Sequence, residues 1–323
     1  MPALAPRAVL ITGASGFIGR HLVAGLARGG VRVVAASRQP LSDVPAGVEW
    51  CELPDLANAG ANNADRFRKL VSGCDAVIHL AGLAHAGHVR PDEDYRAINV
   101  DATRTLAVAA REAGVRRFIL MSSVRAQAGP SAVGVIDEIC KAEPTDAYGR
   151  SKLAAEQVVA ATLDGTATDW VALRPVLVYG PGVGGNMASL IRLARLPLPL
   201  PLAGLSSRRS ILAIANLTGA VAHALQPATP AGRCYLVADR GAIAIGDMIA
   251  AMRSGLGRKP GLVALPPSVL SALLMGLGHG ADVARLLGSL EVDTARLRAT
   301  GWMPSQTSLD GLAQLMRHPA KKR

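Results

Sequence analysis

Aromatic residues and cysteines are scarce in this chain of 323 residues. Phe, Trp and Tyr make up only 3% of it, whereas Ala, Val and Leu dominate, as expected for helices layered on a buried parallel sheet. The four cysteines lie far apart, without a CxxC motif or a His/Cys cluster, which excludes a disulfide framework and a zinc site. No metal site is predicted, and the thiols are interpreted as small buried hydrophobic groups in a reducing compartment. They are Cys51, Cys74, Cys140 and Cys234.

Lysine is rare as well, although the chain is strongly basic. Only six lysines occur, so arginine supplies 29 of the 35 basic residues, and the formal net charge is +11. The arginines are scattered apart from short pairs, and the one basic cluster is the tail from Arg317 to Arg323. No nucleic-acid-binding motif accompanies this charge. We therefore expect no nucleic-acid partner and favour a positive field that concentrates a diphosphate-bearing substrate.

Long apolar runs are also missing. The most apolar later run, Val269 to Leu277, contains Gly276 and falls far short of the ~20 residues that span a bilayer. A strand is expected from about Ala8, which leaves no room for a signal peptide. The sequence thus predicts a soluble, cytoplasmic protein without a membrane partner.

Apolar strands alternate with helices through the first half of the chain. The strands are apolar on both faces, which indicates a parallel sheet covered by helices on each side. Strands are expected at 8–11, 31–36, 76–80, 118–121, 171–173 and 234–237, and helices at 17–28, 65–71, 99–113 and 211–225. This alternation predicts an α/β fold with a doubly wound parallel sheet, the Rossmann fold.

The composition changes after Pro175. Residues 183–205 are rich in Gly, Pro and Leu, and the run from Leu196 to Pro201 resists regular helix and suggests an apolar lid. We predict a nucleotide-binding core made of residues 1–178 and 211–240. A smaller, discontinuous C-terminal lobe, made of residues 179–210 and 241–323, is expected to bind the substrate.

A glycine-spaced turn follows the first expected strand. Gly13, Gly16 and Gly19 stand between that strand and a helix, as a dinucleotide-binding turn requires. Glycines permit a tight turn and a close backbone approach, and the helix N-terminus faces the negative charge of the phosphates. The residues of this turn assigned to cofactor binding are Gly13, Ser15, Gly16, Phe17, Ile18 and Gly19.

The end of the second strand carries Ser37 and Arg38, where an acid usually meets a free ribose 2′-hydroxyl. A hydroxyl and a guanidinium would instead bind a 2′-phosphate. This predicts an NAD(P) cofactor with NADP(H) preferred over NAD(H). The alternative is that Arg38 is a surface charge and that NAD binds through other contacts.

Tyr148 and Lys152 stand four residues apart on an expected helix, so the phenol and the ammonium share one face. A lysine near a phenol lowers its pKa, which would let Tyr148 exchange a proton with a substrate hydroxyl near neutral pH. Ser122 and Ser123 follow a core strand at its carboxyl end, where ligands bind in such sheets. Ser123 is our choice for a hydroxyl that holds the substrate oxygen, and Ser122 could be a structural serine.

These motifs together resemble the extended short-chain dehydrogenase/reductase family, within its NAD-dependent epimerase/dehydratase group that modifies nucleotide sugars. The likeness runs nearly from end to end. It is carried by Thr12-Gly-Ala-Ser-Gly-Phe-Ile-Gly19, His79-Leu-Ala-Gly82, Met121-Ser-Ser123, Tyr148-Gly-Arg-Ser-Lys152, Leu173-Arg-Pro-Val-Leu-Val-Tyr-Gly-Pro181, Arg209-Ser210 and Gly301-Trp-Met-Pro304.

The resemblance implies roles for further residues. Ser123, Tyr148 and Lys152 match the catalytic triad, and Lys152 would also hold the nicotinamide ribose. Asn99 is assigned to the cofactor site, with a structural role in supporting the triad helix as the alternative. His79, His85 and His88 are interpreted as structural. The remaining positions implied for the cofactor are Asp55, Leu56, Leu80, Ala81, Gly82 and Pro175, and those implied for the substrate are Ser123, Asn186 and Arg209.

The resemblance leaves the reaction open. Redox chemistry at C4 of a UDP-linked hexose or N-acetylhexosamine is expected, by a 4-epimerase or a 4-ketoreductase, and Ser37-Arg38 favours reduction. A 4,6-dehydratase is disfavoured because Val124-Arg125 replaces the Asp-Glu pair that such enzymes carry after the triad residue. A reductase of a non-sugar apolar ketone and a non-catalytic cofactor-binding subunit remain alternatives. A homodimer formed by helices near 99–113 and 147–161 is expected.

Overall fold

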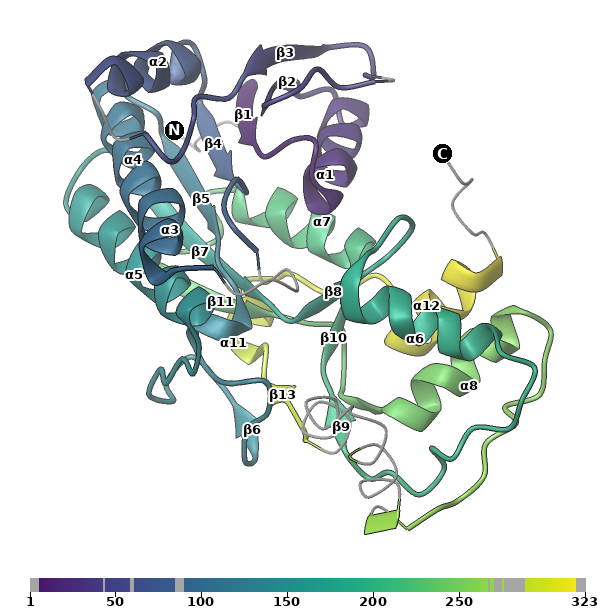
Figure 1. Ribbon diagram of the computed structural model, residues 1–323. Helices are drawn as coiled ribbons and strands as arrows, with labels where there is room; N and C mark the ends of the chain where they lie inside the picture. The colour runs from purple at the N-terminus through teal and green to yellow at the C-terminus, as the bar shows by residue number, and fades with distance from the viewer. Residues whose placement is uncertain are drawn as a thin grey trace.

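Seven strands pair in parallel to form one sheet in this computed structural model, which describes residues 6–42, 44–58, 61–84, 90–266, 268–269, 275 and 288–317 (Figure 1). The strand order is β11-β7-β5-β4-β1-β2-β3. The strands are β1 (Ala8–Thr12), β2 (Arg32–Ser37), β3 (Val48–Glu52), β4 (Ala76–His79), β5 (Arg117–Met121), β7 (Asp169–Pro175) and β11 (Arg233–Val237). The predicted doubly wound parallel sheet is confirmed.

The third strand was not predicted. β3 (Val48–Glu52) lies at the edge of the sheet, where half-buried and exposed residues alternate irregularly and Trp50 is exposed. An edge strand has no continuous apolar run, so its sequence carries no clear strand signal.

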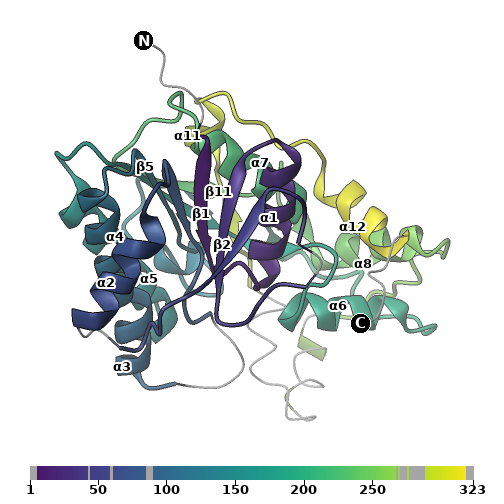
Figure 2. The ribbon, with the colours of Figure 1, turned by 90° about the horizontal axis from the view of Figure 1, so that it is seen from above.

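Alternate side chains of each strand enter different hydrophobic clusters. Val9 and Ile11 of β1 pack with α1 (Phe17–Arg28) and α7 (Ile214–Ala224). Leu10 packs on the other face with α2 (Ala61–Val71), α4 (Ala102–Glu112) and α5 (Ala147–Leu163). Figure 2 shows the sheet between these two helical layers. The period of two in a strand therefore divides the core into two layers.

The chain reverses its direction of travel across the sheet at β1. From β1 it moves outward through β2 and β3, and it then crosses back to β4 on the other side of β1. In open α/β sheets such a switch point creates a crevice at the carboxyl ends of the strands. The glycine turn after β1 and the segments after β4 and β5 meet at this edge.

Two elements differ from the predicted helices. The expected helix 99–113 corresponds to the end of a π-helical turn, η1 (Arg96–Asp101), and to α4, and the helical segment begins earlier than predicted, with α3 (Asp92–Tyr95). The expected helix 211–225 begins with a short strand, β10 (Ile211–Ala213), which pairs in parallel with β8 (Leu177–Tyr179), and α7 follows. Three apolar residues in succession fit a helix and a strand equally well, and pairing with β8 decides between them.

A separate hydrophobic cluster lies outside the sheet. It joins α6 (Gly185–Arg195), α8 (Ile245–Gly255) and α12 (Ser308–Arg317), and Tyr179 is buried in it. Short strand pairs flank this lobe: β9 (Arg208–Arg209) with β12 (Ile243–Ala244), and β6 (Val135–Ile136) with β13 (Glu291–Val292). Leu297 and Trp302, around α11 (Ala295–Arg298), pack instead in a sheet cluster. Part of the sequence assigned to the lobe thus covers the core.

The proline-rich run after α6 is held against another loop at the outer end of that helix. Arg253 is buried and its guanidinium donates hydrogen bonds to carbonyl oxygens of Leu196 (3.0 Å), Leu198 (2.7 Å) and Gly261 (2.9 Å). Figures 1 and 2 show α6 running away from the sheet, with this loop beyond its far end. The interpretation of this run as a lid is therefore not supported.

The described residues include no helix long and apolar enough to cross a membrane. The run at 269–277 and the histidines His85 and His88 lie wholly or mostly outside the described residues. All four cysteines are free, and three of them are buried or half-buried, whereas Cys140 is exposed.

Candidate functional site

The glycine turn after β1 allows no side chains at two of its glycines. Gly13 has a φ of 72°, in the left-handed region, and a Cβ there would lie 2.8 Å from the backbone nitrogen of Ala81. A Cβ on Gly19 would overlap the carbonyl oxygen of Gly13 and the backbone of Ala14. The turn is therefore packed directly against α1 and against the segment that follows β4.

The N-terminus of α1 is open. Gly16 is its N-cap and makes no side-chain capping hydrogen bond, so the N–H groups of Phe17, Ile18 and Gly19 in the first turn have no side-chain partner there. Ser15 and Gly16 are exposed. Free N–H groups and the positive end of the helix dipole favour an anion at this point. The residues present fit the pyrophosphate of a dinucleotide.

A buried hydrogen-bond chain fixes the second wall of the turn. Thr12 bonds to His79 Nδ1 (2.7 Å), and His79 Nε2 bonds to Thr103 (2.9 Å). The Thr12 hydroxyl also accepts from Ala81 N (3.3 Å). Burial lowers the pKa of His79 to about 3, and the charge of Lys152 adds to this effect. His79 is therefore a neutral structural residue, as the sequence analysis interpreted it.

Asn99 joins the segment after β4 to α5. Its side-chain oxygen accepts from Leu83 N (2.7 Å), and its amide donates to Leu83 O (3.1 Å) and to Ser151 Oγ (2.9 Å). Both amide hydrogens are thus used within the protein. These contacts match the structural role that was the alternative for Asn99, rather than direct contact with a cofactor. A Cβ on Gly82 would lie 2.6 Å from its oxygen, so Gly82 is required beside it.

Ser37 has less freedom than the sequence predicted. It is buried, and its hydroxyl donates to Gln39 O (2.6 Å) and accepts from Trp50 Nε1 (3.1 Å). Its proton is therefore not free for a 2′-phosphate. Arg38 is exposed beside it, and no described residue pairs with it. Of the two predicted contacts, only the guanidinium is available.

Asp55 and Leu56 lie in the turn after β3. The Asp55 carboxylate accepts from Ala57 N (3.1 Å), and Asn63 donates to the Asp55 carbonyl (2.8 Å). Leu56 packs against the cluster that includes Leu53. The turn is thus held in place while Asp55 itself stays exposed.

The three residues predicted as catalytic come together at the carboxyl ends of β4 and β5. Ser123 follows β5 and hydrogen-bonds Tyr148 of α5. Lys152 is buried, one turn further along α5, and its Nζ donates to Met121 O (3.0 Å). A Cβ on Gly82 would lie 3.6 Å from that Nζ, so the ammonium lies at the turn after β4. Leu80 begins this turn with a bond from its N–H to Thr12 O (3.2 Å).

Ser122 has the structural role that the sequence analysis left open for it. Its hydroxyl donates to Glu156 of α5, which forms a buried ion pair with Arg174 of β7 at 2.5 Å. Arg174 also donates to Gln127, after β5. This network ties α5 to β5 and β7 beneath the triad. Sequence reasoning missed it because its bonded partners are 18 to 47 residues apart.

Burial governs both ionisable groups of the triad. It raises the pKa of Tyr148, while the hydrogen bond from Ser123 acts in the opposite direction. It lowers the pKa of Lys152 to about 8, and Glu156 opposes that shift. The expectation that Lys152 brings the phenol pKa down is therefore not met by these residues alone, because desolvation outweighs the nearby groups.

The predicted substrate residues lie in the lobe and at the strand ends. Arg209 of β9 donates to Pro130 O (3.0 Å) in the loop after β5, which links the lobe to the core. Asn186 is exposed in the first turn of α6, where no described residue hydrogen-bonds it.

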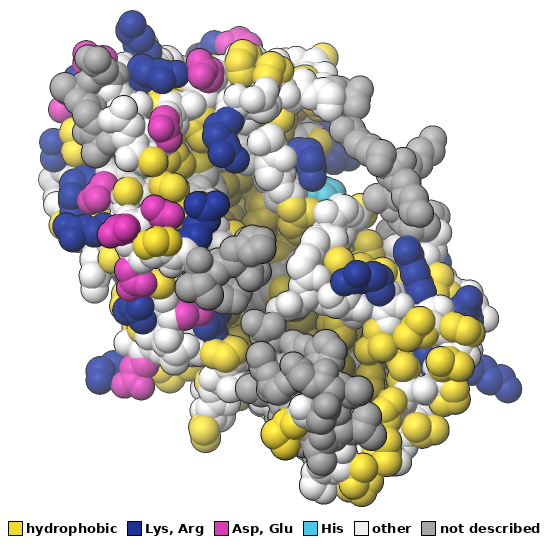
Figure 3. All heavy atoms as spheres, in the orientation of Figure 1, with side chains coloured by type: hydrophobic (Ala, Val, Ile, Leu, Met, Phe, Trp, Pro, Cys, Tyr) yellow, Lys and Arg dark blue, Asp and Glu magenta, His cyan; other side chains and the backbone are white. Residues whose placement is uncertain are grey.

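Pro175, assigned to the cofactor, is buried at the end of β7. In Figure 3 the surface is hollowed between core and lobe, and acidic side chains lie over the core in this view.

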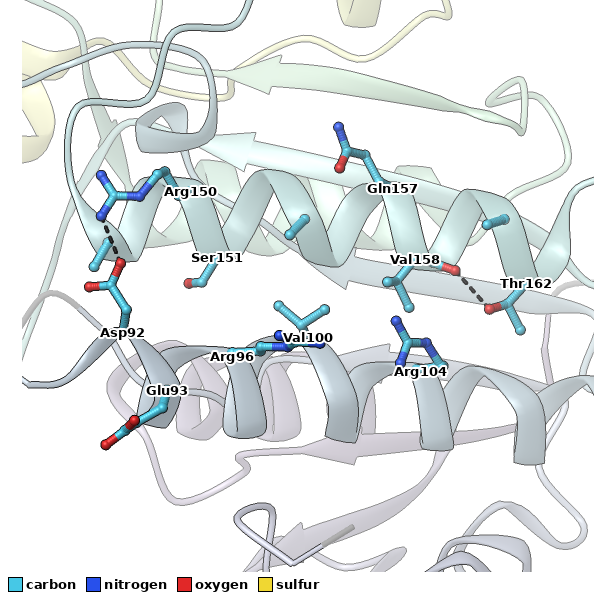
Figure 4. Close-up of a pocket in the computed structure, with 13 residues that line it drawn as sticks. Asp92, Glu93, Arg96, Val100, Arg104, Arg150, Ser151, Gln157, Val158 and Thr162 are labelled. Atoms are coloured by element: carbon cyan, nitrogen blue, oxygen red, sulfur yellow. Dashed lines mark hydrogen bonds and ion pairs between the residues drawn. The ribbon is translucent and has the colours of Figure 1, made fainter.

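A groove of about 740 Å³ lies on the outer side of α5, between it and α3, η1 and α4. Figure 4 shows Val100 and Arg104 facing Ser151 and Val158 across it. Arg150 of α5 bonds Asp92 of α3 at one end (2.9 Å). Three alanines of α5, at every seventh position, line the groove: Ala147, Ala154 and Ala161. Small residues at this spacing leave a helix surface that another helix can approach closely.

Comparisons with known proteins show the family of the chain. Residues 9–238 match the NAD-dependent epimerase/dehydratase family. The chain is 30% identical to a UDP-glucose 4-epimerase of Vibrio cholerae over 96% of its length and 94% of that protein. It is 31% identical to a ceramide reductase of Caulobacter vibrioides over 82% of its length and 75% of that protein. The solved structure of MoeE5 with UDP-glucose and NAD is 27% identical, with a TM-score of 0.72 over 95% of this chain and 97% of that one.

Proposed function

Because the chain belongs to the NAD-dependent epimerase/dehydratase family, we propose that it epimerises C4 of a UDP-linked hexose or N-acetylhexosamine. It is an NAD-dependent enzyme of the extended short-chain dehydrogenase/reductase type. The observation that carries the proposal is the cluster of Ser123, Tyr148 and Lys152 beside an open helix N-terminus. The similarity to a UDP-glucose 4-epimerase along almost the whole chain supports the sugar substrate.

Each member of the triad has a distinct task in this proposal. Tyr148 takes the proton of the 4-hydroxyl and later returns it, because its phenol can alternate between the neutral and ionised forms. Ser123 hydrogen-bonds both that phenol and the substrate oxygen, and so holds the oxygen in line. Lys152, anchored on Met121 O, supplies positive charge at the turn that would hold the nicotinamide ribose. A bound nicotinamide supplies the chemistry of hydride acceptance and return at C4.

The experiment is direct. The purified protein is incubated with UDP-glucose and with UDP-GlcNAc, each without added reductant, and the products are separated by chromatography. We expect the 4-epimer of at least one sugar. Tyr148→Phe should abolish turnover and leave cofactor affinity within about twofold, because the aromatic ring is kept and only the hydroxyl group is removed. Turnover unchanged in Tyr148→Phe would remove the triad from the reaction.

A 4-ketoreductase is the second candidate, and Arg38 is the observation that favours it. No carboxylate stands at the end of β2, and an exposed guanidinium there can bind a 2′-phosphate. We propose that NADP(H) is preferred over NAD(H) through Arg38 alone, since the Ser37 proton is committed to Gln39. Reductases consume a diffusing cofactor of this kind, whereas epimerases retain NAD.

Two measurements separate the candidates. The dissociation constants of NADH and NADPH are compared for the wild type and Arg38→Ala, and we expect the variant to lose affinity for NADPH only. The protein is then given UDP-4-keto sugars with NADPH. Reduction there without epimerisation of UDP-sugars would select the ketoreductase. A clear NADH preference would overturn the NADP(H) assignment. Turnover of a lipid ketone alone would select an activity like that of the ceramide reductase relative.

We assign the substrate diphosphate to Arg209 and Asn186. Arg209 lies on β9 within reach of the loop after β5, and its forked donors suit a diphosphate. Arg209→Ala should raise the KM for the nucleotide sugar by at least about tenfold, because a charge-assisted hydrogen bond is lost. The corresponding change in cofactor affinity should be negligible.

We also propose a homodimer through the groove beside α5. Two copies could pack α4 and α5 against one another, since the alanines permit close approach and Val100 and Val158 are apolar. Sedimentation of the wild type should give twice the chain mass of 33.3 kDa. Ala154→Arg, which fills the groove, should give monomers, and a monomeric wild type would contradict the proposal. Four free cysteines support a cytoplasmic location.

A further inference from the structure

Arg125 lies beside the triad, and the sequence pattern predicted no catalytic or binding role for it. It is in the 3₁₀ turn η2 (Val124–Ala126) directly after Ser123, and its backbone N–H donates to Ser123 Oγ (3.1 Å). Its guanidinium is largely buried, with 17% of the side chain exposed, and donates to Asp146 Oδ2 at 2.5 Å. A charged group is therefore held under the start of α5.

Asp146 contacts residues that lie on both sides of Tyr148 in the sequence. Its Oδ1 accepts a hydrogen bond from Gly149 N (2.7 Å) and so caps α5, while its Oδ2 accepts from the Arg125 guanidinium. Gly149 in turn packs against the carbonyl oxygen of Arg125, with no room for a Cβ between them. The backbone on either side of Tyr148 is thus fixed relative to the Arg125 guanidinium and the Asp146 carboxylate.

The guanidinium is only partly used by these contacts. Its Nη1 is buried and has no hydrogen-bond partner among the described groups. Burying a donor without a partner is unfavourable, and such groups occur where a charge serves a purpose other than fold stability. Tyr148, an ionisable group that the reaction requires, follows Asp146 by two residues in the first turn of α5 and hydrogen-bonds Ser123, whose Oγ accepts from Arg125 N.

We propose that Arg125 and Asp146 are positioning residues that set, with opposite signs, how readily Tyr148 releases its proton. The proposal rests on the role of Tyr148 in the proposed function. A guanidinium stabilises a nearby phenolate, whereas a carboxylate destabilises it. The directions of their effects on the Tyr148 pKa agree, since Arg125 lowers it and Asp146 raises it.

Other groups also face the phenol and must stay constant in a test. Ser123 donates a hydrogen bond to it from the end of β5, and Tyr95 of α3 lies with its ring centroid 6.4 Å away. Lys152 follows one turn along α5. None of these is altered by a change at Arg125 or Asp146.

Three variants test the pair. Arg125→Met removes the cation and keeps most of the side-chain volume, Arg125→Lys keeps the charge, and Asp146→Asn removes the anion and keeps a good helix cap. The Tyr148 pKa is read from phenolate absorbance, as the difference between each protein and the same protein with Tyr148→Phe. The pH profile of kcat is measured beside it. Circular dichroism confirms that each variant is folded.

Removing the cation and removing the anion should shift the Tyr148 pKa in opposite directions. Arg125→Met should raise the Tyr148 pKa by about one unit and Asp146→Asn should lower it by a similar amount, with Arg125→Lys close to the wild type. Shifts in one direction, or no shift in the folded variants, would refute the proposal. If Arg125→Met does not fold, Asp146→Asn still tests the pair, because a Tyr148 pKa that is not lowered in that folded variant would refute the proposal. Because the absorbance titration needs no substrate, it gives a result even if no nucleotide sugar is turned over.

Discussion

Replacing Glu156 by Gln should destabilise the fold strongly. The Glu156 and Arg174 side chains are 4% and 8% exposed, and two hydrogen bonds of 2.9 and 2.5 Å join them. Removing one member of a buried ion pair leaves the other charge uncompensated, which costs about 3–5 kcal/mol. Glutamine keeps the shape of the side chain and part of its hydrogen bonding, so we expect a loss at the lower end of this range, about 3 kcal/mol. The loss is measured as the change in the free energy of unfolding in urea.

A double-mutant cycle identifies the cause. Arg174→Met should also destabilise the protein, but the double variant should lose clearly less than the two single losses added, because neither charge is then left unpaired. The matched control is Glu49→Gln, in the exposed pair with Arg32, which should leave the unfolding midpoint unchanged. A loss below about 1 kcal/mol in Glu156→Gln, or strict additivity in the cycle, would refute the reasoning.

Two further predictions concern the cofactor turn and the buried lysine. Gly19→Ala should weaken cofactor binding by more than about tenfold, because the new Cβ overlaps Gly13 O at the anion-binding turn. Cofactor binding is measured by calorimetry, and Gly184→Ala, where a Cβ meets open space, serves as the control. Burial lowers the pKa of Lys152 to about 8 from its ordinary 10.5, so the folded state disfavours the charged form below pH 8, and this penalty disappears as the pH rises to about 10.5. Lys152→Met should therefore be more stable than the wild type at pH 7, by about 3 kcal/mol, which is the free energy that corresponds to a pKa lowered from 10.5 to about 8. Urea unfolding at pH 7 and at pH 10 should show that advantage shrink at the higher pH, and an equal difference at both would contradict the shift.

The sequence predicted those parts of the site whose members are close along the chain. Tyr148 and Lys152 lie one helical turn apart, and the glycine turn lies between one strand and one helix, so local spacing indicated their geometry. The alternation of apolar strands and helices likewise predicted the parallel sheet, since strands buried on both faces carry continuous apolar runs.

Burial changed the chemistry of residues that the sequence identified correctly. Ser37 was predicted to bind a phosphate, but its hydroxyl is used by Gln39 and Trp50. Tyr148 was expected to have a lowered pKa, yet burial raises it. Spacing says which groups are near one another, whereas pKa depends on how much water each group loses, and that is set by packing.

The amino-acid sequence by itself determined the alternation of the buried strands and their helices, the dinucleotide turn and the spacing of Tyr148 and Lys152, because each depends on residues close together along the chain. The tertiary structure alone decided the partners that arrive from distant segments. Glu156 meets Arg174, and Arg125 meets Asp146, across 18 and 21 residues. No local pattern specifies such pairs, because they form only once the sheet and its helices have packed and excluded water between them.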